Sequence, residues 1–499
     1  MSSILPINRK AARGRSVPGG LLANFVDNQW REVHPSASTA VMNPATGEEL
    51  ARVPLCGTEE IDTAVRAAAA AFPAWRDTPV VDRVQHLFRY KQLLEDHFDK
   101  VSRQIVEENG KTLEEARGEM RRGIEVVDFA CGMPTLMMGE TVEQIAKQID
   151  SYSVRVPLGV VAGICPFNFP AMIPLWMFPI AVAAGNTFVL KPSDKTPLTG
   201  VYLAHLASQS GFPPGVLNVV HGAQAAADAL MSHPAVKAIS FVGSAPVARE
   251  IYRMSAANGK RVQALAGAKN HLVVMPDAEL EPTVKAILSS AFGSAGQRCL
   301  AGSVVVAVGE IGDALVAQLT EKASRMHLGS GLEPDVVLGP VVHEDARTRV
   351  RSYIESGIKE GARLVLDGRE PKLAGRSDGY FLGPCIFDEV RPQMTIAREE
   401  IFGPVLSVIR TRDLNEALAA VNSSRFGNAA SIFTQSGEAA RKFRTKVEAG
   451  MVGVNIGVAA AMAFFSFSGW KGSFFGDLHA TGKDAVRFYT ENRVIIERW

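Results

Sequence analysis

One cysteine in this chain is placed where it could act as a nucleophile. Cys299 directly follows Arg298, at the end of a run of small residues that begins at Ala291. The thiolate is the reactive form of cysteine, and a neighbouring positive charge or a helix N-terminus favours it. A small buried cysteine in a tight turn is the alternative, since free cysteine is among the most buried residue types. The segment predicts covalent catalysis at Cys299 if other parts of the chain supply partners for it.

An asparagine far upstream is a candidate partner. Asn168 lies in the segment Pro166-Phe-Asn-Phe-Pro170. Attack of Cys299 on an aldehyde would place negative charge on oxygen, which the Asn168 amide and the Cys299 backbone N–H could hold. Removing one such donor costs about 3 kcal/mol of transition-state stabilisation. An asparagine between two prolines could also be turn chemistry, but its pairing with Cys299 favours the catalytic interpretation.

Composition excludes several classes of protein. The chain has 499 residues, enough for two or three domains, with 47% hydrophobic and 21% charged residues. Its net charge of +1 gives no basic excess that would indicate nucleic acid binding. Its five cysteines are odd in number and lack CxxC spacing, so we expect no disulfide framework and no metal site. Two long uncharged stretches, 166–190 and 449–470, contain prolines, asparagines, glycines or serines and are expected to be buried rather than membrane-spanning. A reducing compartment fits best, the cytoplasm more than a mitochondrial matrix.

The elements that must position these residues alternate between strand and helix. Buried strands are expected at 160–164, 187–190, 216–220 and 238–242, with helices between them. A second set follows the turn at 264–270, with strands at 271–275 and 303–308. This alternation predicts an α/β fold with parallel, doubly wound sheets, which bind ligands at the carboxyl ends of their strands. Thr112 to Glu115 has capping-box spacing and predicts a helix over 112–131 that carries Arg117, Arg121 and Arg122. The Gly/Ala-rich segment 453–470 is expected to be a buried loop.

A dinucleotide site is indicated without the common fingerprint. No GxGxxG follows a strand. Instead, Lys191-Pro-Ser-Asp194 ends one strand, and Phe241-Val-Gly-Ser244 leads from another strand into a helix at 245–257, whose N-terminus favours phosphate. Each motif alone is weak.

Five motifs in order resemble the aldehyde dehydrogenase superfamily over residues 21 to 499. They are Pro-Phe-Asn-Phe-Pro (166–170), Phe-Val-Gly-Ser (241–244), Gly-Ala-Lys-Asn (267–270), Gly-Gln-Arg-Cys (296–299) and Glu-Ile-Phe-Gly-Pro (400–404). The resemblance implies an aldehyde-dehydrogenase-like fold of two doubly wound α/β domains and a small β oligomerisation element. The implied parts are a disordered arm (1–20), an NAD-binding domain (21–138 and 158–266), a catalytic domain (267–465) and oligomerisation strands (139–157 and 480–499).

The resemblance also implies a site. Cys299 and Asn168 would be catalytic. The residues implied for cofactor binding are Cys165, Phe167, Lys191, Asp194, Lys195, Gly243, Ser244, Ala266, Glu400 and Phe402. An acid at Asp194 would accept from ribose hydroxyls and repel a 2′-phosphate, so NAD is favoured over NADP.

The expected product depends on a glutamate of hydrolytic relatives that this chain lacks. Hydrolytic relatives carry Glu-Leu-Gly-Gly after the cofactor domain, and that glutamate activates water, whereas this chain has Gln263-Ala-Leu-Ala-Gly-Ala-Lys269. Water is a poor nucleophile without a base, but a thiol is already partly ionised near neutral pH. The sequence therefore favours coenzyme A as the co-substrate. This agrees with a resemblance to the methylmalonate-semialdehyde dehydrogenase, coenzyme-A-acylating branch.

Two arginines define the expected substrate. Arg122 and Arg298 match the branch's carboxylate-binding arginines, and guanidinium suits bidentate carboxylate binding. We expect oxidation of methylmalonate or malonate semialdehyde, with loss of CO₂, to propionyl- or acetyl-coenzyme A. The segment Ile456–Ala463 departs from the family's proline-rich loop and leaves the choice of semialdehyde open.

Other interpretations stay open at this point. They are a hydrolytic dehydrogenase of another acidic semialdehyde and a non-catalytic dinucleotide-binding relative. The expected partners are small molecules and further copies of the chain, as a homotetramer (dimer of dimers) or a homodimer, with neither nucleic acid nor membrane.

Overall fold

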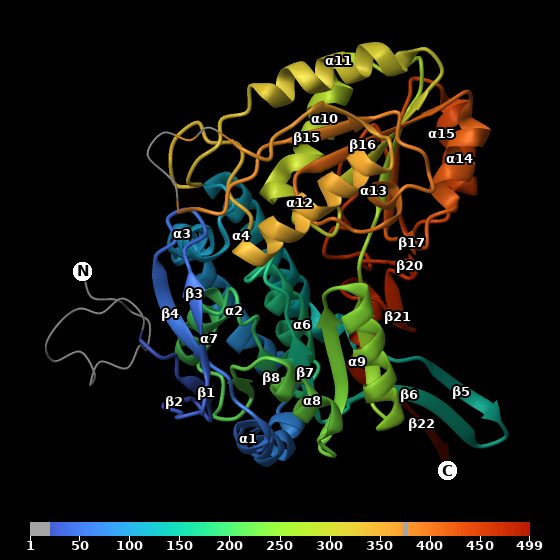
Figure 1. Cartoon of the computed structure of the whole chain (residues 1–499). Helices are drawn as coiled ribbons and strands as arrows, with labels where there is room; N and C mark the ends of the chain where they lie inside the picture. Colours follow the sequence, from blue (N-terminus) through green and yellow to red (C-terminus); the bar gives the residue numbers. More distant parts are fainter. Residues whose placement is uncertain (1–19, 372, 374–377) are drawn as a thin grey trace, which may run out of the picture.

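The computed structural model describes residues 20–371, 373 and 378–499. Two α/β halves lie one above the other, and a narrow β element projects from the lower half (Figure 1). The disordered arm predicted for residues 1–20 lies, except for residue 20, outside the described residues. The predicted α/β fold with two doubly wound sheets is confirmed.

The lower half is built on an eight-stranded sheet in the order β2-β1-β9-β8-β7-β10-β11-β21. The five strands β9, β8, β7, β10 and β11 are parallel, as the alternation of strands and helices predicts. The strands are β1 (Asn24–Val26), β2 (Gln29–Arg31), β7 (Val160–Ile164), β8 (Thr187–Lys191), β9 (Leu217–Val219), β10 (Val236–Val242), β11 (Arg261–Leu265) and β21 (Phe474–Gly476). A hairpin of β3 (Ser38–Met42) and β4 (Glu49–Pro54) lies beside it.

Helices cover both faces of this sheet. They are α1 (Thr58–Asp77), α2 (Val80–Asp96), α3 (Phe98–Asn109), α4 (Leu113–Cys131), α5 (Met133–Leu136), α6 (Met172–Ala183), α7 (Leu198–Gln209), α8 (Gln224–Ser232) and α9 (Ala245–Ala257). The capping box predicted for α4 is present: the Thr112 hydroxyl accepts from Glu115 N at 3.3 Å, and the Glu115 carboxylate accepts from Thr112 N at 2.9 Å. Helix α4 packs against α6, which is buried along its whole length.

The upper half contains a seven-stranded sheet in the order β14-β15-β16-β13-β12-β18-β19. The strands are β12 (Asn270–Val274), β13 (Gly302–Val308), β14 (Arg363–Leu366), β15 (Cys385–Asp388), β16 (Val405–Thr411), β18 (Ala429–Phe433) and β19 (Met451–Val454). One apolar cluster lies under α10 (Leu280–Phe292) and α11 (Ile311–Ser324). A second lies under α12 (Glu344–Lys359), α13 (Thr395–Arg398), α14 (Leu414–Asn422) and α15 (Gly437–Lys446). Short strands β17 (Phe426–Gly427) and β20 (Trp470–Lys471) pair at its edge.

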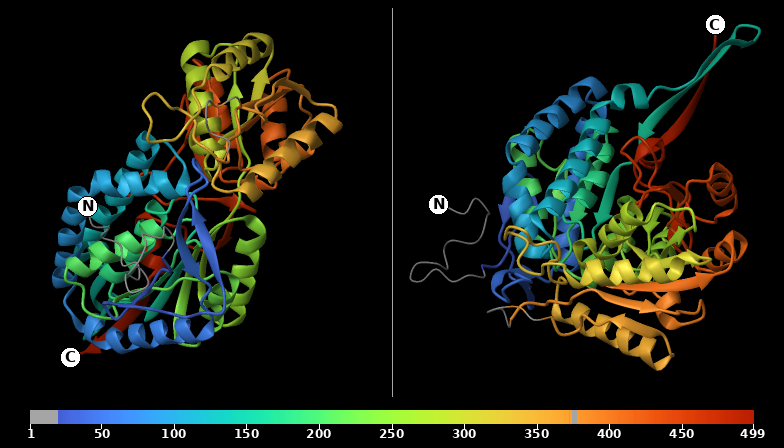
Figure 2. Two further views of the ribbon diagram at one scale, coloured as in Figure 1. Left: turned by 60° about the vertical axis from the view of Figure 1, so that its left-hand side comes forward. Right: turned by 90° about the horizontal axis from the view of Figure 1, so that it is seen from above.

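The projecting element is a three-stranded antiparallel sheet, β22-β6-β5. It consists of β5 (Thr141–Ala146), β6 (Ile149–Pro157) and β22 (Thr490–Arg498), and the view from above shows it extending well beyond the helices (Figure 2). Strand character was predicted for the whole of 480–499, but Gly482–Phe488 form helix α16, which contacts α6. Its apolar residues Ala485, Val486 and Phe488 are all buried, so packing determines its conformation.

The loop after β19 differs from its prediction. Its composition suggested burial, yet Phe464 and Phe465 are 67% and 70% exposed, and Ile456 is 49% exposed. The prediction was wrong because apolar composition does not distinguish a core segment from an apolar surface loop. Within the described residues, no helix combines the length and the apolar character needed to cross a membrane.

Candidate active site

The segment before the cysteine is held in an uncommon backbone conformation. Ser294, Ala295 and Gly296 all have positive φ angles, of 50°, 52° and 70°. The Glu115 carboxylate on α4 accepts from Ser294 N at 2.6 Å and so ties this turn to the lower half. A Cβ on Gly296 would lie 2.2 Å from the carbonyl oxygen of Gly403, which explains the glycine. Two motifs far apart in sequence therefore meet at the cysteine.

The backbone of Cys299 is fixed by two asparagine side chains. Its carbonyl oxygen accepts from the amides of Asn270 and Asn428, each at 2.9 Å. Asn270 also donates to the Ala301 carbonyl and accepts from Ala429 N. These bonds connect β12 and β18 to the cysteine, so the sheet of the upper half sets the position of the thiol.

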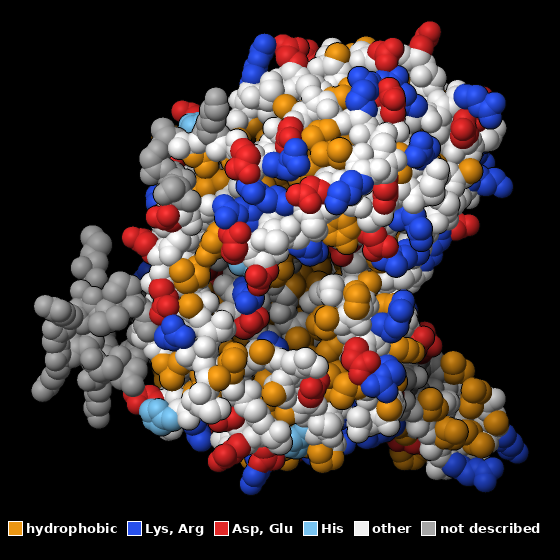
Figure 3. All heavy atoms as spheres, in the orientation of Figure 1, with side chains coloured by type: hydrophobic (Ala, Val, Ile, Leu, Met, Phe, Trp, Pro, Cys, Tyr) orange, Lys and Arg blue, Asp and Glu red, His pale blue; other side chains and the backbone are white. Residues whose placement is uncertain are grey.

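Cys299 lines two cavities. One, of about 430 Å³, also contains Phe167, Ser244 and Glu400; we call it the cofactor cavity. The other, of about 250 Å³, also contains Arg122 and Trp176; we call it the substrate cavity. The cofactor cavity is lined from both halves of the molecule, which are separated by a hollow on the face seen in Figure 3. A group bound in either cavity can reach the same sulfur atom.

Asn168 lies beside the nucleophile segment, as predicted. Its side-chain amide donates to the Gln297 carbonyl at 3.0 Å, and it lines the cofactor cavity together with Cys299. An amide nitrogen carries two hydrogens, so one remains for an oxygen developing negative charge. The Gln297 side chain in turn accepts from Val342 N at 3.0 Å.

A buried ion pair supports the segment that carries Asn168. The Lys111 ammonium contacts the Glu119 carboxylate at 2.6 Å, and both side chains are fully buried. The same ammonium donates to the Asn168 carbonyl at 2.7 Å. The carboxylate accepts from Ala171 N and Met172 N, at the beginning of α6. All of these charged groups are hydrogen-bonded, as a buried pair requires.

The environment of the thiol does not favour the thiolate in the free enzyme. Burial raises the pKa of Cys299 to about 12, and the Glu400 carboxylate adds to the increase. Arg298 opposes it but is outweighed. The positive charge expected to favour the thiolate is present but does not dominate, because the unfavourable desolvation of a thiolate is larger than the stabilisation by one nearby cation.

Most of the predicted cofactor residues come together. Those lining the cofactor cavity are Cys165, Phe167, Asp194, Lys195, Gly243, Ser244, Ala266, Glu400 and Phe402. Lys191 does not line it: its ammonium donates to the carbonyls of Pro192 and Gly222, at 3.0 and 2.7 Å. Ser244 occupies the N-cap position of α9 without a side-chain capping hydrogen bond, so the free backbone N–H groups there favour phosphate. The carboxylate of Asp194, the phosphate-binding end of α9 and the carboxylate of Glu400 fit the ribose, pyrophosphate and ribose sequence of a dinucleotide.

Glu400 lines the cofactor cavity, and Lys269 is a buried charged residue of the neighbouring segment 263–269. Glu400 accepts from Ala268 N at 2.9 Å, and burial raises its pKa. Burial lowers the pKa of Lys269 to about 7, and its ammonium has no hydrogen-bond partner among the described residues.

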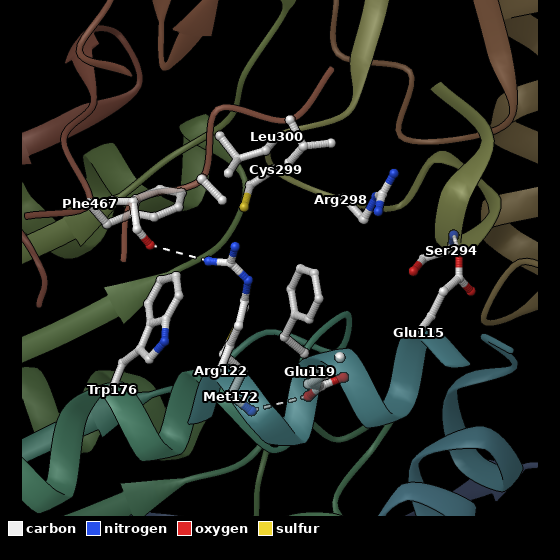
Figure 4. Close-up of a pocket in the computed structure, with 15 residues that line it drawn as sticks. Glu115, Glu119, Arg122, Met172, Trp176, Ser294, Arg298, Cys299, Leu300 and Phe467 are labelled. Atoms are coloured by element: carbon white, nitrogen blue, oxygen red, sulfur yellow. Dashed lines mark hydrogen bonds between the residues drawn. The ribbon is translucent and has the colours of Figure 1, made fainter. Parts of the chain in front are cut away.

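The two arginines predicted to bind a carboxylate are arranged differently. Arg122 points into the substrate cavity toward Cys299, and its guanidinium donates to the Ala461 carbonyl at 3.2 Å (Figure 4). Arg298 lines the same cavity, but its guanidinium points away and donates to the carbonyls of Ser289 and Ser290. The other two arginines of α4 pair at the surface: Arg117 with Asp99 and Arg121 with Glu95. Only Arg122 thus presents its guanidinium to the cavity.

Several site residues were missed by reasoning from sequence. Asn270 stands in the motif Gly-Ala-Lys-Asn but was given no role, and Asn428 was not singled out. His343, the N-cap of α12, and Arg349 on that helix also line the cofactor cavity and were not predicted. Glu119 offered a weak signal, because it shares a helix face with Ala116, Met120 and Gly123.

Known proteins resemble the whole of this arrangement. Residues 30–495 match the aldehyde dehydrogenase family. Malonate-semialdehyde dehydrogenase 3 of Geobacillus kaustophilus is 56% identical over 478 residues, which cover 96% of this chain and 99% of that protein. The crystal structure of methylmalonate-semialdehyde dehydrogenase from Oceanimonas doudoroffii superposes with a TM-score of 0.94 at 47% identity, covering 96% of this chain and 98% of the other. The NAD⁺ complex of an aldehyde dehydrogenase from Bacillus cereus has a TM-score of 0.91 at 31% identity, covering 99% of each chain.

Proposed function

The chain belongs to the aldehyde dehydrogenase family, and from this premise we propose that it oxidises malonate and methylmalonate semialdehydes with NAD and transfers the acyl group to coenzyme A. The carboxyl group is lost as CO₂, so the products are acetyl- and propionyl-coenzyme A. The observation that carries the proposal is the absence of a free carboxylate where a hydrolytic enzyme needs a base.

Each carboxylate near Cys299 is already engaged. Among the described residues that line the two cavities, the acids are Glu115, Glu119, Asp194 and Glu400. Glu115 accepts from two backbone N–H groups and Glu119 belongs to the buried ion pair. Glu400 accepts from Ala268 N, and the Asp194 carboxylate lies 3.6 Å from the Lys195 ammonium. The turn 263–269, where hydrolytic relatives carry their glutamate, contains no carboxylate, whereas a thiol supplies its own nucleophile.

The side chains then have defined tasks. The Cys299 thiolate attacks the aldehyde carbon, and the second hydrogen of the Asn168 amide binds the oxygen that becomes negative. When bound, the nicotinamide of NAD accepts the hydride. Cys299 is left as a thioester, and the sulfur of coenzyme A displaces it, which regenerates the thiol.

Arg122 supports an acidic substrate. Its guanidinium faces the cavity and uses only one of its donors, on the Ala461 carbonyl. The remaining donors suit a carboxylate. Apolar side chains also line this cavity, among them Trp176, Phe467 and Leu300. A β-oxo acid bound there has its carboxylate at Arg122 and its aldehyde carbon at Cys299. Its thioester stabilises the carbanion formed as CO₂ leaves, and a proton from solvent then adds to that carbon to give the acetyl or propionyl group.

The test is NADH formation from both semialdehydes, with and without coenzyme A, and with the product identified by mass. We expect sustained turnover only with coenzyme A, giving acetyl- or propionyl-coenzyme A. Steady formation of free acid without coenzyme A would mean that another group activates water and would reject the proposal.

A second test addresses the carboxylate. Arg122→Gln should raise KM for malonate semialdehyde by about tenfold or more, since hydrogen bonds to charged groups contribute about 1.5–3 kcal/mol. Its effect on propanal, which has no carboxylate, should be small. Arg298→Gln should have a smaller effect than Arg122→Gln, because its guanidinium already binds backbone carbonyls. Equal losses for both aldehydes would contradict a carboxylate-binding role.

We also propose that the chain forms a homodimer or a dimer of dimers through the sheet β5-β6-β22. Its residues Val142, Ile145, Val494 and Ile496 are 54% to 70% exposed, and orange side chains cover the projection at the lower right of Figure 3. In the same proposal, residues 21–138 and 158–266 hold NAD and residues 267–465 carry the nucleophile.

A further inference from the structure

A third cavity lies behind the active site, between α13, β16 and the end of α14. Its volume is about 380 Å³, and its polar lining consists of His271, Gln393, Arg398, Ser423, Ser424 and Arg425. We call it the arginine cavity. It shares no lining residue with the cofactor or substrate cavity.

The charge of this cavity distinguishes it from the other two. Two arginines and no carboxylate line it, whereas acids line both the substrate and the cofactor cavities. Arg398 has no ion pair with any residue that the structure describes, and Arg425 pairs with Glu399 through one nitrogen at 2.5 Å. Lys471 lies nearby: its ammonium donates to the carbonyls of Asn422 and Ser424, at and just after the end of α14, and pairs with the Glu448 carboxylate at 2.7 Å. Figure 3 shows blue side chains gathered at this edge, where Figure 1 places β17 and β20. The cavity is therefore suited to an anion.

His271 provides a hydrogen-bond acceptor in the arginine cavity. It is only 4% exposed, and its Nδ1 lies 2.9 Å from the Lys269 carbonyl. A carbonyl only accepts, so Nδ1 carries the hydrogen and Nε2 of the neutral ring is an acceptor. The ring is neutral near pH 7, because burial lowers the pKa of His271 to about 4. No described side chain donates to Nε2, although the ring lines the cavity. The cavity thus offers one buried acceptor beside two cations.

Ser424, just after the end of α14, adds a hydrogen-bond donor to the arginine cavity. The Ser424 hydroxyl oxygen accepts from Phe426 N at 3.2 Å, which leaves its hydrogen free to donate. An anion between the arginines would therefore find a further donor, and a hydroxyl on the same molecule would find the acceptor at His271.

We propose that the arginine cavity binds a small organic anion that carries a hydroxyl group. Arg398 and Arg425 hold the anionic oxygens, Ser424 donates to one of them, and the hydroxyl donates to His271 Nε2. A carboxylate or a phosphate monoester could supply the anionic oxygens, because guanidinium binds both. The proposal does not depend on the function proposed above.

The test is calorimetric titration of the whole enzyme with saturating NAD, so that the cofactor cavity is filled. Glycerate and glycerol 3-phosphate are the two probes and distinguish a carboxylate from a phosphate. We expect at least one of them to bind with a Kd near or below about 1 mM, and we expect propanoate, which lacks the hydroxyl, to bind about tenfold more weakly. If neither probe binds at several times that concentration, the proposal is wrong.

Variants locate the binding. Arg398→Gln should weaken it by about tenfold or more, and because Arg398 is exposed the variant should fold normally. Ser424→Ala is a second, milder change in the same cavity. Arg412→Gln is the matched control, since Arg412 is an arginine with a side chain 91% exposed that pairs with Glu416 outside the cavity. Binding that survives Arg398→Gln but is lost in Arg122→Gln would place the probe in the substrate cavity and overturn the proposal.

Discussion

Cys299 combines an accessible position with a thiol that holds its proton. It reaches two cavities, yet burial and the Glu400 carboxylate raise its pKa to about 12. Chemistry at this residue therefore depends on a change in its surroundings when ligands bind. We therefore expect oxidation and alkylation of Cys299, which act on the thiolate, to be slow in the free enzyme.

Alkylation of the enzyme without NAD tests whether the Cys299 thiol is protonated. The rate of modification of Cys299 by iodoacetamide should rise about tenfold per pH unit between pH 7 and 9, because the thiolate fraction rises by that factor below the pKa. Glu400→Gln removes a negative charge that raises the pKa, so its rate at pH 8 should be several-fold higher. Glu399→Gln is the control, since that carboxylate pairs with Arg425. A rate that is independent of pH above 7 would show that the thiolate is already formed.

Reasoning from sequence located the reacting residues better than their supports. Cys299, Asn168, Glu400 and Arg122 stand in motifs, and the structure places them at one site. The rotamer of Arg298 could not be predicted, because it depends on the carbonyls of Ser289 and Ser290 in the last turn of α10, nine and eight residues earlier. Asn270 stands in a motif, but its bond to the Cys299 carbonyl, like that of Asn428, is a long-range contact that the local sequence does not reveal.

At the scale of elements, the helices and strands of the first half follow their predictions closely. Strand β7 and helix α9 begin and end where the sequence places them. Their apolar runs are short and bounded by glycine, proline or polar residues, which is a strong local signal. The predictions for segments 453–470 and 482–488 were wrong, because tertiary contacts, and not local composition, decide whether these segments are buried or helical.

The ion pair between α4 and the segment that precedes it is expected to matter most for stability. Lys111→Met leaves the buried Glu119 carboxylate without its cation and should lower the free energy of unfolding by about 3–5 kcal/mol. Lys91→Met, in the exposed pair with Asp128, should lower it by less than about 1 kcal/mol. Urea unfolding of both variants checks this.

A double-mutant cycle with Lys111→Met, Glu119→Gln and the double variant measures the interaction free energy of the pair. We expect a coupling energy of about 1–3 kcal/mol, because the two groups are in contact at 2.6 Å. Additive losses would mean that each residue acts only through its backbone partners. The variants should also lose activity, since Lys111 fixes the Asn168 carbonyl.

At the scale of the whole molecule, the projecting sheet exposes apolar side chains that no other part of the described chain covers. Replacing both Val494 and Ile496 by Asp should dissociate an oligomer formed through this sheet, because buried unpaired carboxylates are strongly unfavourable. Light scattering should then report a smaller particle than for the unchanged protein. Val81→Asp is the control, at an apolar residue 53% exposed on α2. A monomer before any substitution would contradict the proposed assembly.

Because both cavities are lined by Cys299, one inhibitor could occupy the two of them at once. A thiol-reactive centre at Cys299 could carry one arm with a carboxylate toward Arg122 and another arm toward the beginning of α9. One arm would be held by a side chain of α4 and the other by backbone N–H groups at the beginning of α9, so that a substitution weakening one arm would leave the other in place. Linking them would make the second contact intramolecular, which raises affinity without any new interaction. A hydrolytic relative with a glutamate at the turn after β11 would meet the same molecule with a charged group in its path, and would be spared.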